Sequence, residues 1–127
     1  MVHQSLPDLS RNELDVMKLL WKRGGLSARE IHDTLGEGHS WSYSTTRTVL
    51  DRMVKKELLS KKSFHGLNLF QPLVSKAAGL ARFVRTFAEE VLEMEMAPVV
   101  SLFTDSKALN PEELDELMAI LDEGEKR

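Results

Sequence analysis

The chain has 127 residues, enough for one compact domain with a small additional unit, and its composition of 42% hydrophobic and 29% charged residues is that of a folded protein. Cysteine is absent, which excludes disulfides, iron–sulfur clusters, thiolate zinc sites and a cysteine nucleophile. No apolar run approaches the roughly 20 residues that a membrane span needs. The first residues lack the basic start and apolar core of a signal peptide. We therefore expect a cytoplasmic protein with no membrane partner.

The net charge of −3 hides an asymmetry along the chain. Residues 1–88 contain 14 Lys and Arg against 8 Asp and Glu, whereas residues 89–127 contain 3 against 12. The sequence thus indicates a basic binding module that carries an acidic accessory segment.

Two short helices are predicted first, because capping-box pairs precede apolar patterns at helical spacing. The first helix should span residues 10–23 and end at a pair of glycines. The second should begin at Ser27 and end near Gly36. The capping-box pairs are Ser10 with Glu13 and Ser27 with Glu30. A turn rich in Gly and Ser then leads to a third helix, and this order favours a helix-turn-helix.

The third helix, expected over residues 44–57, has two different faces. Thr46, Val49, Leu50 and Met53 share one side. The other side and its flanks carry small hydroxyls at the amino end and cations toward the carboxyl end, which suits an element that enters the DNA major groove. An ordinary amphipathic surface helix is the alternative for this segment alone. The expected DNA-binding residues in and before this helix are Ser42, Tyr43, Ser44, Thr45, Arg47, Thr48, Arg52 and Lys55.

Residues 58–64 and 67–72 are two extended runs on either side of His65-Gly66, and this pattern predicts a β-hairpin. Lys61 and Lys62 are expected near its tip, as further DNA-binding residues. A basic hairpin directly after such a helix is typical of the wing of a winged helix, which lies along the phosphate backbone. A plain two-stranded ribbon with solvated lysines is the alternative.

Three more helices are expected toward the carboxyl end. Ser75 should cap the first, whose apolar stripe would be broken or kinked near Pro98. A short helix over residues 98–104 should follow. Asn110 and Pro111 then supply the cap and first residue of the last helix. The stripe of the first of these helices comprises Leu80, Phe83, Val84, Phe87 and Val91.

We therefore expect a mainly α fold with a small β-hairpin: a winged helix-turn-helix DNA-binding domain over residues 1–74 and a helical dimerisation domain over residues 75–127. The last three helices would pack against a second copy, and a symmetric dimer would give a DNA reader two recognition helices. Folding back of these helices on their own chain is the alternative. The expected dimer contacts are Phe83, Phe87, Val91, Leu114, Leu117 and Leu121.

Five segments of the chain are distinctive: LSRNELDVMKLLW (9–21), LSAREI (26–31), TTRTVLDRMVKKELL (45–59), FQPLVS (70–75) and EELDELMAIL (112–121). They resemble the penicillinase-repressor (BlaI/MecI) family of bacterial winged-helix transcriptional regulators over nearly the whole length. The first helix with its Trp21 and the Thr-x-Arg-Thr pattern are the most specific parts of the resemblance.

This resemblance implies a homodimer that represses transcription by occupying an inverted-repeat operator in double-stranded DNA. It assigns base and phosphate contacts to Thr45, Arg47 and Thr48. Family members that answer β-lactams are cut by a protease between Asn and Phe, and the corresponding bond here is Leu102–Phe103, where the Asn is missing. Cleavage through a sensor protease and a core role for these two residues both stay open, and the core role is favoured.

Two positions depart from the family pattern. Ser44 stands where a lysine is frequent, which removes one cation from the groove. Asp51 stands where relatives tend to be uncharged. We expect it to pair with Arg47 or Lys55, four residues away, rather than to accept a hydrogen bond from a cytosine.

Catalytic and metal-binding patterns are missing from the sequence. The four histidines have no metal-ligand spacing, and neither a nucleotide-binding glycine loop nor a Ser–His–acid order stands out. We therefore expect no metal, no cofactor and no enzyme activity. Trp21 is expected in the core, and Trp41 in the core or on a short strand beside the wing. Two other functions stay open: a winged-helix scaffold that binds another protein, and a repressor that senses a small molecule.

Overall fold

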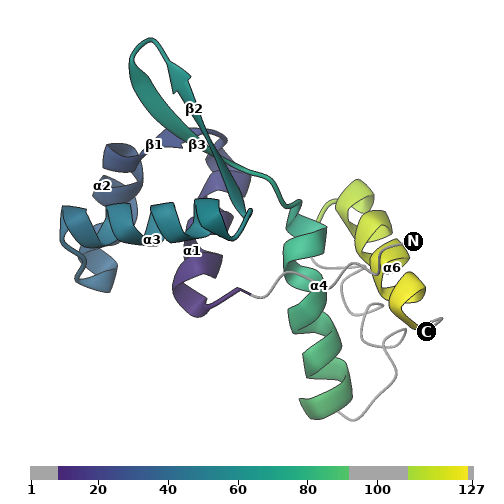
Figure 1. The fold of residues 1–127 in the computed structure, drawn as a ribbon. Coiled ribbons are helices and arrows are strands. Elements are labelled where there is room, and N and C mark those ends of the chain that lie inside the picture. The colour runs from purple at the N-terminus through teal and green to yellow at the C-terminus, as the bar shows by residue number, and fades with distance from the viewer. Residues whose placement is uncertain (1–8, 92–108, 126–127) are drawn as a thin grey trace. The chain divides into compact units, whose positions relative to one another are not determined.

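A computed structural model describes residues 9–91 and 109–125, which form two units (Figure 1). The amino-terminal unit, Leu9–Ser75, contains α1 (Arg11–Arg23), β1 (Leu26–Ser27), α2 (Ala28–His39), α3 (Tyr43–Lys55), β2 (Leu59–Phe64) and β3 (Leu67–Pro72). The carboxyl-terminal unit, described from Lys76 onward, contains α4 (Lys76–Thr86), the π-helical turn η1 (Phe87–Val91) and α6 (Pro111–Glu125). The predicted mainly helical fold with a β-hairpin is confirmed.

Reciprocal capping boxes start α1 and α2, as predicted. Glu13 N donates to Ser10 Oγ at 3.2 Å, and Ser10 N donates to Glu13 Oε1 at 2.9 Å. The same exchange joins Ser27 and Glu30 at 3.2 and 3.0 Å. Each box satisfies two backbone N–H groups that a helix start leaves unpaired, which is why these short helices begin where they do.

α2 is longer than predicted. It continues through Gly36 and Gly38 to His39, and Ser40 ends it with a left-handed φ of 57°. A glycine inside a helix costs stability but does not terminate it. At Gly36 an added Cβ would collide with the ring of His32, so this glycine leaves room for a side chain of its own helix.

The amino-terminal unit closes a core of its own. Thr46 is fully buried, Trp21 packs at the edge of this core, and Trp21 Nε1 donates to the carbonyl oxygen of Val74 at 2.8 Å. The prediction that Thr46, Val49, Leu50 and Met53 form the inner face of the third helix is confirmed. The buried apolar residues are Leu9, Val16, Met17, Leu20, Leu26, Ala28, Ile31, Val49, Leu50, Met53, Leu58, Leu59 and Phe70.

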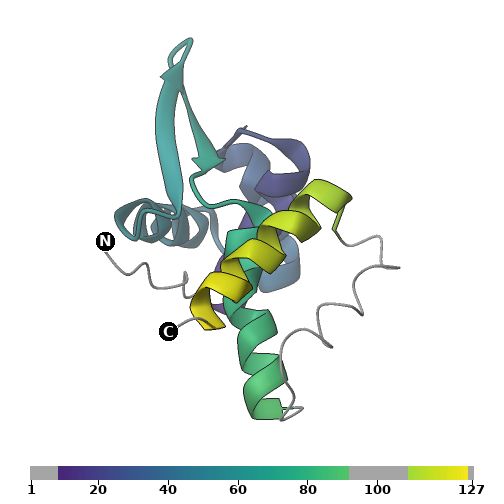
Figure 2. The same cartoon turned by 90° about the vertical axis from the view of Figure 1, so that its right-hand side faces the viewer.

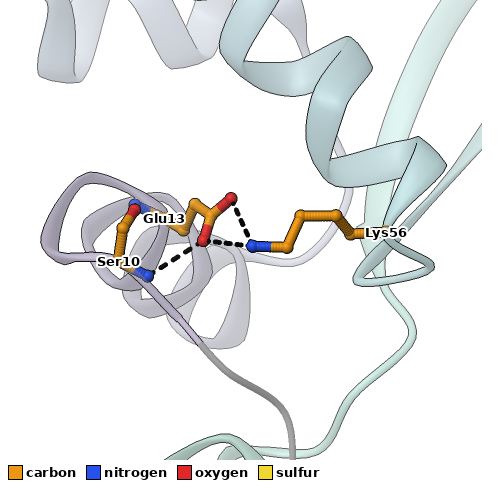
Figure 3. Close-up of polar contacts among 3 residues, drawn as sticks. All are labelled: Ser10, Glu13 and Lys56. Atoms are coloured by element: carbon orange, nitrogen blue, oxygen red, sulfur yellow. Dashed lines mark hydrogen bonds and ion pairs between the residues drawn. The ribbon is translucent and has the colours of Figure 1, made fainter.

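An ion pair joins the start of α1 to the end of α3 (Figure 3). Lys56 Nζ lies 2.8 and 2.9 Å from the two carboxylate oxygens of Glu13, a residue that is only 5% exposed. Burial alone would raise the pKa of Glu13, but hydrogen bonds from Lys56 and Ser10 and the charge of Lys56 together lower this pKa below its ordinary value of 4.5. The carboxylate is therefore ionised at neutral pH and tied to two helices.

A third strand accompanies the hairpin. The sheet is antiparallel with the order β1-β3-β2, and Leu26 and Ser27 of β1 pair with Phe70 and Leu69 of β3. The short strand beside the wing is therefore β1, and Trp41 instead packs at the edge of the core with its ring stacked on His39, 4.4 Å between centroids.

The hairpin extends beyond the three helices of its unit (Figures 1 and 2). His65 and Gly66 form its turn with φ values of 52° and 79°, the left-handed backbone that a two-residue hairpin loop needs. Lys61 and Lys62 were predicted near the tip. They lie instead in the middle of β2, opposite Phe70 and Leu69, because β2 continues to the residue before the turn.

The carboxyl-terminal unit has a separate core between α4 and α6 (Figures 1 and 2). Asn110 caps α6 as predicted, since Glu113 N donates to Asn110 Oδ1 at 2.7 Å. Phe83 and Phe87 of the stripe predicted for the fourth helix are 37% and 45% exposed within the single chain, so their contact with a second copy stays a prediction. The small residues one position further on face α6 instead. The buried residues of this core are Ala77, Ala81, Val84, Ala88, Leu109, Leu117 and Leu121.

The expected dimer contacts differ in how far their own chain buries them and in whether the structure describes them. Leu117 and Leu121 are 0% and 2% exposed within their own chain, so their assignment to a subunit contact is corrected: they are core residues that α4 and η1 cover. Leu114 is partly buried against the same core. The side chain of Val91, the Leu102–Phe103 bond and the helix expected over residues 98–104 lie outside what the structure describes.

Candidate nucleic-acid interface

α3 turns a polar surface to solvent. Its buried side carries the core residues described above, so residues between them in the helical repeat must point outward. We call this exposed set the α3 outer face. It consists of Ser44, Thr45, Arg47, Thr48, Asp51, Arg52 and Lys55.

The hydroxyls at the amino end of α3 hold one another in place. Ser42 is the N-cap, and its Oγ accepts from Thr45 N at 3.1 Å. The same Oγ lies 3.0 Å from Ser44 Oγ and 3.0 Å from Thr45 Oγ1. Thr48 Oγ1 donates to the carbonyl oxygen of Ser44 at 3.0 Å. These exposed hydroxyls are thus preset in orientation before any ligand arrives.

Tyr43 gathers charged and aromatic neighbours at the same end of α3. The guanidinium carbon of Arg29, from the first turn of α2, lies 4.1 Å from the centroid of its ring, and that of Arg47 lies 6.0 Å away. The rings of His32 and Tyr43 form a T-shaped pair, 5.6 Å between centroids. Sequence reasoning missed Arg29, since no motif or spacing links a residue of α2 to one that follows 14 positions later.

Asp51 forms no ion pair with the cations near it within residues 9–91. It is exposed, and the predicted pairing with Arg47 or Lys55 is wrong. Residues 43–72 carry 6 Lys and Arg against 2 Asp and Glu. The α3 outer face and the hairpin together are therefore basic.

The hairpin adds two cations and an apolar end. Lys61 and Lys62 are both exposed and, as neighbours in a strand, they point to opposite faces of the hairpin. Phe64 and Leu67 face each other beside the turn, and both are exposed.

Residues 9–91 and 109–125 contain neither a cluster of metal-binding side chains nor a membrane-spanning helix. No group of three or more His, Asp or Glu side chains there could hold a metal ion. None of the helices in those ranges is long and apolar enough to span a membrane.

Three helices followed by a β-hairpin, with an exposed basic third helix, define a winged helix-turn-helix protein. The sequence model of the penicillinase repressor family matches residues 9–123, and the chain belongs to this family.

Relatives of known identity match along almost the whole chain. The penicillinase repressor of Bacillus licheniformis is 27% identical over 124 residues, which cover 98% of this chain and 97% of that protein. The methicillin resistance regulatory protein MecI of Staphylococcus aureus is 25% identical over 114 residues, 90% of this chain and 93% of that one.

Solved structures match over a shorter part of the chain. Bacillus licheniformis BlaI, solved as a monomer in complex with the blaP half-operator, has a TM-score of 0.52 at 28% identity and covers 58% of this chain and 90% of its own. The DNA-binding domain of the repressor BlaI has a TM-score of 0.51 at 28% identity, over 60% of this chain and 93% of its own.

Proposed function

We propose that this chain is a transcriptional repressor that binds an inverted-repeat DNA operator as a homodimer. The observation that carries the proposal is the α3 outer face: a preset row of hydroxyls, followed by arginines and a lysine, on a helix whose opposite side is anchored in the core. The proposal places the protein in the cytoplasm and gives it no cofactor and no catalytic step.

The two ends of the α3 outer face would contact different parts of the DNA. Thr45, Arg47 and Thr48 lie on the exposed side near the amino end, where they would reach base edges in the major groove. Arg52 and Lys55 follow toward the carboxyl end and would contact phosphates. The likeness to the monomeric BlaI that was solved with a half-operator supports this assignment.

The remaining phosphate contacts would come from the two ends of the interface. Ser42, Tyr43 and Ser44 form the start of α3, where backbone N–H groups and hydroxyls favour an anion. Lys61 and Lys62 lie in the wing, one on each face of the hairpin, so a duplex beside one face would meet one of them directly.

Exposed aromatic residues of α4 and η1 are the proposed subunit contact. Phe83 and Phe87 lie four residues apart, on one side of the helix, and their own unit leaves them partly uncovered. A second copy would cover both. Cleavage of the Leu102–Phe103 bond as a route of release stays a prediction.

Selection of genomic fragments with the purified protein tests the proposal. Bound fragments should share an inverted repeat, and their affinity should fall steeply as salt rises, because phosphate contacts release counterions. Failure to enrich any sequence, together with salt-independent binding, would reject DNA recognition and favour a winged-helix scaffold for another protein.

A further inference from the structure

We infer that Arg29 is a phosphate-binding residue of the interface and that the ring of Tyr43 positions it. This inference rests on the proposed function, to which it adds a cation from α2, an element outside the α3 outer face and the wing. The role given to Tyr43 also changes, from a phosphate contact through its hydroxyl to a platform for a guanidinium.

Arg29 is exposed and has a choice of partners. Asp33 lies four residues further along α2, at the spacing of a helical ion pair. The structure puts the guanidinium over Tyr43 instead, 4.1 Å from the ring centroid. Within residues 9–91, Arg29 makes neither an ion pair nor a hydrogen bond, so its N–H donors face solvent. A guanidinium held over the face of a ring can keep its N–H donors available for a ligand.

The Tyr43 ring is itself supported by packed neighbours. The rings of His32 and Tyr43 form a T-shaped pair, and His32 Nδ1 lies 2.7 Å from Oγ1 of the buried Thr46. Gly36 provides the space for the His32 ring, because a Cβ there would overlap it. Tyr43 is therefore supported by α2 and by its own helix, and a cation stacked on it has a defined place.

The first turn of α3 supplies no cation of its own beside the Tyr43 ring. The first four residues of α3, Tyr43 to Thr46, contain no Lys or Arg, and Arg47 is the first cation of the helix. Arg29 and Arg47 both have their guanidinium carbons within 6.0 Å of the same ring centroid. A planar guanidinium matches the oxygens of a phosphate with two parallel hydrogen bonds, which a freely rotating lysine does not. The geometry thus suits a nucleic-acid phosphate at the amino end of α3.

The test is the salt dependence of binding to a fluorescent mixed-sequence duplex, measured by anisotropy over a series of KCl concentrations. Arg29→Gln should reduce the slope of log K against log salt by about one, because one phosphate contact is lost. It should also weaken binding about fivefold at about 0.15 M salt. Lys18→Gln, which removes an exposed cation from α1, is the control and should leave the slope unchanged.

Variants of Tyr43 separate the ring from the hydroxyl. Tyr43→Phe keeps the ring and should lose less of the slope than Tyr43→Leu, which removes the ring and should reduce the slope as Arg29→Gln does. The double variant Arg29→Gln with Tyr43→Leu should lose no more than either single variant, because the two residues act as one contact. Thermal unfolding by circular dichroism checks that each variant is folded.

Three results would overturn the inference: an unchanged slope in Arg29→Gln, an equal loss in Lys18→Gln, or a loss in Tyr43→Phe as large as in Tyr43→Leu. Each of these leaves the proposed function standing when the wild type binds the duplex with a steep salt dependence. Absence of such binding by the wild type would instead reject the proposed function.

Discussion

Arg47 is the first cation of α3, and its side chain is exposed. Its guanidinium can donate two parallel hydrogen bonds to a guanine edge, and each such pair discriminates by about 1–3 kcal/mol. We expect Arg47→Ala to weaken binding to the selected operator by about 1–3 kcal/mol and to bring it closer to binding of random duplex. Gel-shift titration on both duplexes measures this. Equal discrimination before and after the substitution would contradict base readout by Arg47.

The Glu13–Lys56 ion pair makes stability depend on pH. The folded-state pKa of Glu13 is lowered, so its contribution is present above the ordinary value of 4.5 and is lost as pH falls through the lower folded-state pKa. Lys56→Met should cost about 1–3 kcal/mol of unfolding free energy at neutral pH, toward the lower end because the Lys56 side chain is 41% exposed.

Urea unfolding at a series of pH values measures that difference between wild type and variant. It should shrink once the pH drops below 4.5. The neighbouring Lys55→Met is the matched control, because Lys55 is exposed and has no ion pair within residues 9–91. A constant difference down to acid pH would contradict the assigned role of Glu13.

α2 contains two glycines whose replacement should have opposite effects. Gly38→Ala meets no atom within 4 Å and should stabilise the helix by about 0.5 kcal/mol, the lower end of the range for a helix interior, because Gly38 lies next to the last residue of α2. Gly36→Ala should destabilise by about 1–2 kcal/mol, since it displaces His32 and leaves the hydroxyl of Thr46 with a weaker partner. Thermal melts of the pair test this, and stabilisation by both substitutions would contradict the described packing of His32.

The sequence was sufficient to predict the elements whose ends are marked by capping or turn residues. Ser10, Ser27 and Asn110 each stand three residues before a glutamate, and all three start helices through reciprocal bonds. His65-Gly66 predicted the hairpin for a similar reason, because few residue pairs accept the backbone of that turn. Local chemistry of this kind acts over a few residues and can be read directly from the chain.

Contacts between residues far apart in the chain could not be predicted from the sequence. Apolar spacing in the fourth helix did not reveal which residues pack within the chain: Ala77 and Ala81 are buried, whereas Phe83 and Phe87 are exposed. Both stripes have helical spacing, and only the presence of α6 decides which of them is covered. The stacking of Arg29 on Tyr43 likewise depends on how α2 meets α3.

Assembly of two chains should depend on the exposed aromatics of the carboxyl-terminal unit. Replacing Phe83 and Phe87 together by Glu should give a folded monomer, because both side chains are partly exposed and contribute little to their own core. Binding to the two-fold operator should fall sharply through lost avidity, with half-site binding retained. Sedimentation velocity gives the mass, and an unchanged dimer would reject this surface.

Leu117→Glu is the contrasting substitution. Leu117 is fully buried between α4 and α6, so a carboxylate there should unfold the carboxyl-terminal unit rather than separate folded subunits. Circular dichroism should therefore report lost helix for Leu117→Glu and native helix for the Phe83 and Phe87 variant. Native helix content in both would contradict the core described for this unit.

The closed core of residues 9–75 also makes that segment portable. Its buried side chains all come from within the segment, so an excised fragment should keep its shape and read a single half-site. Fused to an unrelated coiled coil, the same fragment would keep its preferred bases, while the distance between half-sites would be set by the new partner segment. Sequence preference and spacing would then evolve, or be engineered, independently.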